Sequence, residues 1–410
     1  MGKYQGYEKY QDSGVEWLGA IPKHWGVKRF KFSVDLINNK IEAENSKLPY
    51  MGLEHIESWT GKRIEDDNAL SEGLASHFRP NDVLFGKLRP YLAKVYLSEI
   101  EGLVSTEALV LRSKKYIYPK YLKYYILSRD FINIVDSSTF GAKMPRASWD
   151  FIGNLFLAIP PLDEQETIAR FLDYKTKQID DLIAKKETLI EKLDEKRTAL
   201  ISHAVTKGLD PNVPMKDSGI EWLGEIPEHW KIKKIQYIGL LKSGENITSQ
   251  QIDKEGLYPV FGGNGLRGYF DLYTHDGHYI LIGRQGALCG NINYANGKFW
   301  ASEHAVVVTP STTFEVYWLG ELLKTINLNQ YSTSAAQPGL SVEQIGRLKI
   351  PFPFIDEQKQ IAKYLDQKIT QIDQQKAKVK EAIELLKEYR TALITNAVTG
   401  KIDVRQVPIL

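Results

Sequence analysis

Long polar side chains stand at two places in the sequence where an apolar stretch ends at a glycine. Lys87 and Arg89 follow VLFG in the first half of the chain, and Arg284 and Gln285 follow ILIG in the second half. Arginine and lysine can donate hydrogen bonds to O6 and N7 of guanine, and glutamine can pair with adenine, each giving about 1–3 kcal/mol of discrimination between bases. These residue types therefore predict contacts to DNA bases from two strand ends.

A second pair of loops carries similar side chains. Lys143 and Arg146 lie in GAKMPR, and Gln337 lies in AAQPG. A simple turn before a strand is the alternative interpretation of both loops.

Basic residues after the two HW motifs are expected to contact phosphates. Such contacts orient a protein on DNA without reading its sequence. These residues are Lys28, Arg29 and Lys31 in the first half, and Lys233 and Lys234 in the second.

Candidates for catalysis, metal binding and cofactor binding are weak. Residues 263–268 (GNGLRG) fit the dinucleotide-binding pattern G-x-G-x-x-G, but the strand-like YFDLY follows where that site requires a helix. No phosphate-binding G-x-x-x-x-G-K-[ST] motif occurs, and His275 and His278 lack accompanying ligands. His24 and His229 each precede a tryptophan of a repeated motif and are expected to pack or to cap. We therefore predict no catalytic residue, no metal and no cofactor.

The composition limits the class of protein more than its activity. A net charge of +2 argues neither for nor against nucleic acid. Residues 112–146 hold eight Lys or Arg and only two acids, although a solvated helix with an aromatic inner face explains them equally well. The single cysteine, Cys289, cannot form an internal disulfide and is expected to be buried, which fits a reducing cytoplasm. No run approaches about 18 apolar residues, so neither a membrane span nor a signal peptide is expected.

The chain contains the same framework twice. Residues 11–25 and 216–230 share eleven of fifteen positions, including both tryptophans. A second repeat starts at the DEQ motifs of Asp163 and Asp356, and both copies run on to RTALI. Between these motifs lie divergent segments, at about 26–162 and 231–355. The pattern predicts two recognition modules that share a scaffold but recognise different targets.

The DEQ motifs open two long helical stretches, residues 163–206 and 356–400. Asp163 is expected to be an N-cap with Glu166 completing a capping box, and Gly208 is expected to form a left-handed C-cap. Antiparallel pairing of the helices, each on the order of 60 Å long, would place the two modules at opposite ends; the alternative is that each helix packs only on its own module. Apolar residues seven positions apart predict a coiled-coil seam, broken once at Lys186: Leu172, Ile179, Leu193, Leu200, Leu365, Ile372, Val379, Leu386 and Leu393.

The divergent segments have the pattern of mixed α/β modules. Short apolar runs such as DVLFGKL and HAVVVTP are bounded by Gly, Pro or Asn, as strands are. Residues 119–135 predict a helix opened by a proline, and residues 315–330 predict its counterpart. The predicted fold is therefore two copies of a mixed, strand-rich α/β recognition domain, joined by two long antiparallel coiled-coil helices in an internal pseudo-twofold repeat.

The doubled DSG-x-EWLG-x-IP-x-HW motif, each followed by a divergent segment and a helix from DEQ to RTALI, resembles the specificity subunit of a type I restriction-modification system over essentially the whole chain. One departure is that Pro351-Phe-Pro353 replaces the paired prolines Pro160-Pro161. The resemblance implies two target recognition domains, each reading one half of a split double-stranded DNA sequence. It also implies helices that dock two methyltransferase subunits, with motor-nuclease subunits joining the full complex.

We predict a non-catalytic, cytoplasmic DNA-reading subunit whose helices set the half-sites about one duplex turn apart, roughly 34–36 Å. Two alternatives stay open: a coiled-coil adaptor that binds only protein, and a silent-copy specificity protein without DNA-reading activity. The predicted domains are a first target recognition domain with its N-terminal motif (1–162), a central helix (163–207), a linker, repeated motif and second recognition domain (208–355), a C-terminal helix (356–400) and a tail (401–410).

Overall fold

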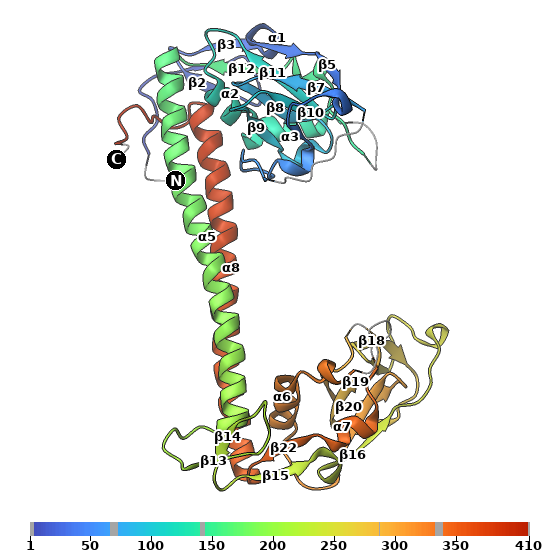
Figure 1. Cartoon of the computed structure of the whole chain (residues 1–410). Helices are drawn as coiled ribbons and strands as arrows, with labels where there is room; N and C mark the ends of the chain where they lie inside the picture. Colours follow the sequence, from blue (N-terminus) through green and yellow to red (C-terminus); the bar gives the residue numbers. More distant parts are fainter. Residues whose placement is uncertain (1–3, 66–72, 140–143, 287, 333–338, 409–410) are drawn as a thin grey trace. The chain divides into compact units, whose positions relative to one another are not determined.

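The computed structural model describes residues 4–65, 73–139, 144–286, 288–332 and 339–408. The chain forms two compact units: Met1–Glu187 with Lys380–Leu410, and Thr188–Val379. Two long helices, α5 (Leu162–Lys207) and α8 (Ile355–Val398), each contribute one part to each unit (Figure 1). The predicted two long helices and two strand-rich α/β domains are therefore confirmed.

The first unit contains two four-stranded sheets, ordered β4-β11-β8-β9 and β5-β7-β10-β6. In the first sheet the apolar residues of β8 (Asp82–Gly86) and β11 (Ala108–Ser113) are buried, because alternate side chains point into two different hydrophobic clusters, one on each face of the sheet. The remaining strands are β1 (Tyr10–Asp12), β2 (Ala20–Pro22), β3 (Gly26–Arg29), β4 (Val34–Ile37), β5 (Lys40–Glu42), β6 (Tyr50–Met51), β7 (Leu74–Phe78), β9 (Val95–Leu97), β10 (Gly102–Ser105) and β12 (Phe156–Ile159). The unit also has short helices α1 (Phe30–Ser33) and α4 (Trp149–Ile152).

The stretch predicted as one helix over residues 119–135 is two helices, α2 (Pro119–Ile126) and α3 (Arg129–Ser137). The prediction of a single helix is wrong because the buried Ser128 adopts extended backbone angles and its hydroxyl donates to the carbonyl of Tyr125 at 2.6 Å. The carbonyl of Ser128 then accepts the first bond of α3, from the amide of Ile132. A short polar side chain that bonds to the backbone in this way competes with a continuous helix.

Helix α2 carries a lysine, Lys123, whose side chain is only 13% exposed, and this makes the stability of the first unit depend on pH. The Nζ of Lys123 lies 3.8 Å from Asp173 Oδ1 on α5, and burial lowers the pKa of Lys123 from 10.5 to about 8, an effect that Asp173 opposes. The folded chain thus binds this proton less tightly than the unfolded chain does. Charged Lys123 therefore costs stability below pH 8, and the cost fades as the pH rises to about 10.5.

We expect Lys123→Met to stabilise the first unit by about 1–3 kcal/mol at pH 7, with a much smaller gain at pH 10. Asp173 keeps two partners in this variant, Lys120 at 2.9 Å and the hydroxyl of Tyr124 at 2.7 Å. Chemical denaturation at several pH values measures the effect. The matched control is Lys120→Met, which removes an exposed lysine from the same carboxylate and should not stabilise. A gain for Lys123→Met that is equal at pH 7 and pH 10 would contradict the burial argument.

The second unit is built around a six-stranded sheet ordered β16-β21-β19-β20-β17-β18. Its strands are β16 (Gly239–Ser243), β17 (Tyr258–Gly262), β18 (Gly265–Phe270), β19 (His275–Gly283), β20 (Ile292–Ala301) and β21 (Ala305–Pro310). Helices α6 (Val316–Ile326) and α7 (Val342–Arg347) accompany it, with the strand pairs β13 (Met215–Asp217)–β14 (Glu225–Pro227) and β15 (Lys231–Lys234)–β22 (Lys349–Phe352). The glycines of GNGLRG form the hairpin between β17 and β18, so no helix follows them.

Both long helices begin one residue earlier than expected and are followed by left-handed glycines. The amides of Glu164 and Gln165 both donate to the carbonyl of Pro161, so α5 starts at Leu162. The prediction that Asp163 is the N-cap is therefore wrong, because Asp163 already lies in the first turn, where a carboxylate still favours the positive end of the helix. The predicted C-cap is confirmed, since Gly208 follows α5 with φ +80°; Gly400, after α8, has φ +72°.

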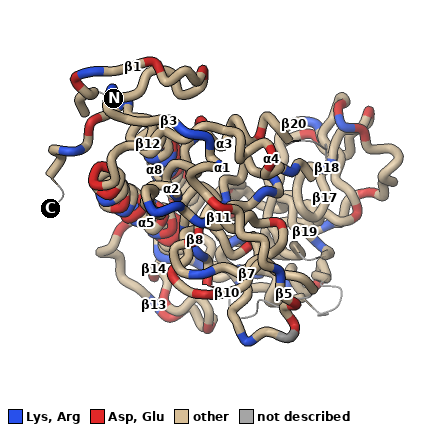
Figure 2. Tube along the Cα trace, turned by 90° about the horizontal axis from the view of Figure 1, so that it is seen from above, with Lys and Arg blue, Asp and Glu red and all other residues tan. Residues whose placement is uncertain are grey.

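In each unit, α5 and α8 lie side by side and run in opposite directions. In the first unit, Arg390 of α8 donates to Asp180 of α5 at 2.9 Å. In the second unit the equivalent Arg197 of α5 lies 3.9 Å from Asp373 of α8. The start of α5 thus lies beside the end of α8, and the end of α5 beside the start of α8, which is an antiparallel pair. Seen from above, α5 shows both acidic and basic positions (Figure 2).

The residues of the predicted seam are all shielded from solvent to some degree. Leu172, Ile179 and Leu393 belong to the hydrophobic core of the first unit, and Leu365 belongs to that of the second. The helices therefore pack on their modules as well as on each other. The buried members are Leu172, Ile179, Leu193, Leu365, Ile372 and Leu393, and the half-buried members are Leu200, Val379 and Leu386.

Candidate nucleic-acid interface

Three loops of the first unit are joined side by side by backbone hydrogen bonds. The amide of Lys87, just after β8, donates to the carbonyl of Glu107 at 2.9 Å, and the amide of Ala147 donates to the carbonyl of Lys87 at 2.9 Å. The amide of Arg89 donates to the carbonyl of Pro145 at 2.8 Å. The two loops predicted from the sequence therefore meet, together with a third loop. We call residues 87–89, 105–107 and 144–147 the strand-end loops of the first unit.

The second unit repeats this arrangement with different side chains. The amide of Arg284, just after β19, donates to the carbonyl of His304 at 2.9 Å, and the amide of Leu340 donates to the carbonyl of Arg284 at 2.9 Å. Gln285 and Gly339 form an antiparallel bridge. The strand-end loops of the second unit are residues 284–286, 302–304 and 339–340. The same backbone scaffold thus carries a different set of polar groups in each unit.

The sequence interpretation missed the third loop of each unit. Residues 105–107 read Ser-Thr-Glu and residues 302–304 read Ser-Glu-His. Both stand before an alanine and a strand of branched residues, at the same offset of 197 that relates Lys87 to Arg284. That shared offset was the signal that could have found them. Glu107 and His304 are accordingly equivalent positions in the two units.

Polar side chains of the strand-end loops differ in how firmly they are held. Arg146 is exposed, and its guanidinium forms two hydrogen bonds with Glu107. Arg284 is half-buried, and its Nη1 donates to Ser243 Oγ at 3.1 Å. Arg89 and Gln285 are exposed, and Arg89 has a left-handed φ of +50°. Lys143 and Gln337 lie outside the described residues.

The residues predicted to contact phosphates lie on the framework and not in the strand-end loops. Lys28 and Arg29 are exposed on β3, and Lys31 on the adjoining α1 donates to Asn154 Oδ1 at 2.8 Å. Lys233 and Lys234 are half-buried on β15. The Nζ of Lys28 lies 4.4 Å from the ring centroid of Tyr116, and Nζ of Lys233 lies 4.1 Å from that of Phe352. The aromatic rings hold these ammonium groups at the surface, where phosphate contact stays a prediction.

The repeated tryptophan motifs fasten the beginning of one helix and the end of the other. In the first unit the buried carboxylate of Glu164, in the first turn of α5, accepts from Tyr7 Oη at 2.6 Å and Trp25 Nε1 at 3.1 Å, and lies 2.7 Å from His24 Nε2. The Nζ of Lys401, beyond α8, donates to the carbonyl of Leu18 at 2.8 Å. Burial and the neighbouring carboxylate raise the pKa of the Tyr7 hydroxyl well above its usual value.

The second unit has equivalent contacts between its tryptophan motif and the long helices, but with fewer hydrogen bonds to the glutamate of the DEQ motif. His229 Nε2 lies 2.9 Å from Glu357 Oε2 in the first turn of α8, and Lys207 at the end of α5 donates to the carbonyl of Leu223 at 3.0 Å. Trp230 Nε1 is buried without a partner among the described residues. Both histidines thus hold helix starts, as the expected packing or capping role requires.

The glutamine of each DEQ motif connects the long helix to its module. Gln165 accepts from the amide of Tyr118 at 2.8 Å, and Gln358 accepts from the amide of Glu315 at 2.9 Å. Tyr118 and Glu315 are the N-cap residues of α2 and α6. The predicted correspondence between α2 and α6 is therefore confirmed, and the strand-end loops stand on modules that are anchored alike.

Across the described ranges, no group of three or more His, Cys, Asp or Glu side chains is placed to hold a metal ion. Within those same ranges, none of the helices is both long and apolar enough to cross a membrane. Cys289 is buried, as expected, and its thiol donates to the carbonyl of Arg284 at 3.2 Å. The strand-end loops present long polar side chains, of which Arg146 and Arg284 are held by hydrogen bonds.

The sequence model of one protein family matches most of the chain. The sequence model of the type I restriction modification DNA specificity domain matches twice, at residues 36–192 and 227–385. The EcoprrI specificity subunit of Escherichia coli is 44% identical over 140 residues, which are 33% of this chain and 35% of that relative. The MjaVIII specificity subunit of Methanocaldococcus jannaschii is 24% identical and covers 94% of this chain and 95% of its own length.

A solved structure shares the fold over nearly the whole chain. It comes from work on complex assembly and conformational transition of the type I R-M system. Its TM-score is 0.73 at 18% sequence identity, and the match covers 92% of this chain and 98% of that one.

Proposed function

The chain belongs to the type I restriction-modification DNA specificity family. From that premise we propose that it reads a split DNA target, and that the strand-end loops of each unit read one half of it. The observation that supports this proposal is the doubled scaffold of joined loops. Lys87, Glu107 and Ala147 are connected by the same two backbone hydrogen bonds as Arg284, His304 and Leu340. A repeated scaffold with different side chains is what two readers of different half-sites need.

We propose that the bases are contacted from the major groove, where each base pair presents a distinct pattern of donors and acceptors. Lys87, Arg89 and Arg146 would read one half-site, and Arg284 and Gln285 the other. Lys143 and Gln337 belong to the same proposal by their place in the sequence. The basic residues of β3, α1 and β15 would contact phosphates on either side.

We propose further that catalysis comes from partner proteins. Methylation would be supplied by two methyltransferase subunits and cleavage by motor-nuclease subunits, with the chain itself binding no cofactor and acting in the cytoplasm. The paired helices α5 and α8 would fix the number of base pairs between the half-sites and offer a mixed-charge surface to the methyltransferase. Lys192 and Glu195 illustrate this surface, since both are exposed on α5.

Selection of DNA from a random pool tests the proposal. The purified chain, with a methyltransferase subunit from the same kind of system, is incubated with random duplexes, and the retained duplexes are sequenced. We expect a motif of two specific blocks separated by a non-specific gap. A chain that binds the methyltransferase but enriches no motif would instead be a protein adaptor or a silent-copy protein.

Salt dependence separates phosphate contacts from base contacts. Each neutralised phosphate contributes about −0.9 to the slope of log K against log salt. We expect Lys31→Ala to weaken binding equally for all sequences and to make the slope shallower by about 1, while the selected motif stays the same. Lys216→Ala, which removes an exposed lysine of β13 that has no proposed contact, is the control and should leave the slope unchanged. If Lys31→Ala alters the motif, Lys31 has been assigned to the wrong class of contact.

A further inference from the structure

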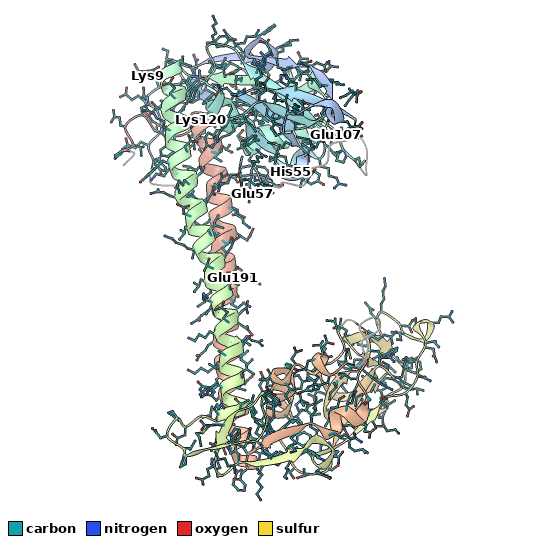
Figure 3. The ribbon with its side chains drawn as sticks, in the orientation of Figure 1. Lys9, His55, Glu57, Glu107, Lys120 and Glu191 are labelled. Atoms are coloured by element: carbon teal, nitrogen blue, oxygen red, sulfur yellow. The ribbon has the colours of Figure 1, made fainter. Side chains whose placement is uncertain are left out.

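Arg146 presents one edge of its guanidinium to a carboxylate of a neighbouring loop. Its Nε donates to Glu107 Oε2 at 2.9 Å and its Nη2 donates to Glu107 Oε1 at 3.2 Å. Both residues belong to the strand-end loops of the first unit, on the side away from α5 and α8, where Glu107 is labelled in Figure 3. An exposed ion pair of this kind adds little to stability, so its position suggests a role in binding.

The geometry of guanidinium gives such a pair a second use. The group is planar and has two edges that can each donate two parallel hydrogen bonds: Nε with Nη2, and Nη1 with Nη2. Glu107 occupies the first edge. Among the described residues no partner contacts Nη1, so the second edge stays available for a planar pair of acceptors. In the major groove, O6 and N7 of guanine form such a pair.

We propose that Glu107 and Arg146 act together as a guanine reader of the first unit, with Arg146 as the base-contacting residue and Glu107 as its positioning residue. The inference rests on the proposed function and deepens it by naming a base and a residue pair. Glu107 fixes the plane of the guanidinium, so that Arg146 meets a base edge in one orientation instead of moving freely to a phosphate. The backbone bonds from Lys87 to Glu107 and from Ala147 to Lys87 keep the two side chains on one scaffold.

The second unit does not have this pair. The position equivalent to Glu107 is His304, and the residue that bridges to Gln285, as Arg146 bridges to Leu88, is Gly339. Glycine offers no side chain to a base, and the nearby arginine of that unit, Arg284, bonds instead to Ser243. The guanine reader is therefore a feature of one half-site, and its loss should be visible at one position only.

The test compares variants of the full chain in complex with the methyltransferase, using selection from random duplexes and then binding to single-base variants of the selected motif. Glu107→Gln keeps the size of the side chain, but its amide group can accept only one of the two bonds. Arg146→Lys keeps the charge but has no planar fork. Asp35→Asn is the matched control, since Asp35 forms an exposed pair with Lys114 at 3.5 Å, beyond the opposite end of β11.

We expect Glu107→Gln and Arg146→Lys to relax discrimination for guanine at the same single position of one half-site, by about 5- to 150-fold for the lysine variant and by less for Glu107→Gln. The other half-site, the melting temperature and the Asp35→Asn variant should keep wild-type behaviour. If Arg146→Lys relaxes that position and Glu107→Gln does not, the positioning role is overturned. Equal weakening for all sequences identifies a phosphate contact and overturns the reader. A wild-type chain that selects no motif overturns the proposed function as well.

Discussion

Replacing Arg284 with alanine should damage recognition of only the half-site read by the second unit. Arg284 stands just after β19, and its guanidinium is half-buried with one bond to Ser243, so its direction is largely fixed before DNA arrives. A well-placed arginine contributes about 1–3 kcal/mol of discrimination at its base pair. Binding to duplexes that carry changes in one half-site or the other measures the effect as a loss of roughly 5- to 150-fold in base preference.

The equivalent variant of the first unit is the matched control for Arg284→Ala. Lys87 occupies the same place after β8 and its amide makes the same backbone bond. Lys87→Ala should therefore affect the opposite half-site and leave the half-site of Arg284 intact. If each variant impairs both half-sites equally, the assignment of one half-site to each unit is wrong.

Replacing Glu164 with alanine should strongly destabilise the first unit. The carboxylate is 5% exposed and connects Tyr7, His24 and Trp25 to the first turn of α5. Its removal leaves the buried Tyr7 hydroxyl and Trp25 indole N–H without an acceptor, and we expect a cost of about 3–5 kcal/mol. Scanning calorimetry is the suitable measurement, because a protein of two units need not unfold in one step.

Glu357→Ala provides the comparison for Glu164→Ala within the same chain. Glu357 has the same place in α8, but it pairs with His229, which is 41% exposed. A partly exposed pair contributes about 1 kcal/mol or less, so Glu357→Ala should cost far less than Glu164→Ala. Equal costs for the two variants would mean that the buried hydrogen bonds of Tyr7 and Trp25 do not carry the difference.

Internal repetition is the reason that much of the fold was predictable from one sequence. The offsets between the copies located both long helices and both tryptophan motifs, and the offset of 197 relates the loops after β8 and β19. Helix boundaries were less accurate where a backbone group competed with a side chain. The carbonyl of Pro161 starts α5 in place of Asp163, and the hydroxyl of Ser128 divides α2 from α3.

Contacts between residues far apart in the sequence could not be derived in this way. Nothing in the sequence places Glu107 beside Arg146, because the pairing depends on how the strand-end loops are joined through Lys87. In the same way, the sequence indicated that His24 packs or caps, but its contact with Glu164 spans 140 residues. Such contacts follow from the order of strands in the sheets, which the local patterns leave open.

Methylome sequencing tests the central claim most directly. The chain is expressed with its methyltransferase partner in a host that otherwise lacks DNA methylation, and every methylated position is mapped. We predict one gapped motif with two specific blocks, of which Lys87→Ala alters one block and Arg284→Ala alters the other. An uninterrupted motif, or a gapped motif in which both variants change the same block, would contradict the claim that each unit reads its own half of the target.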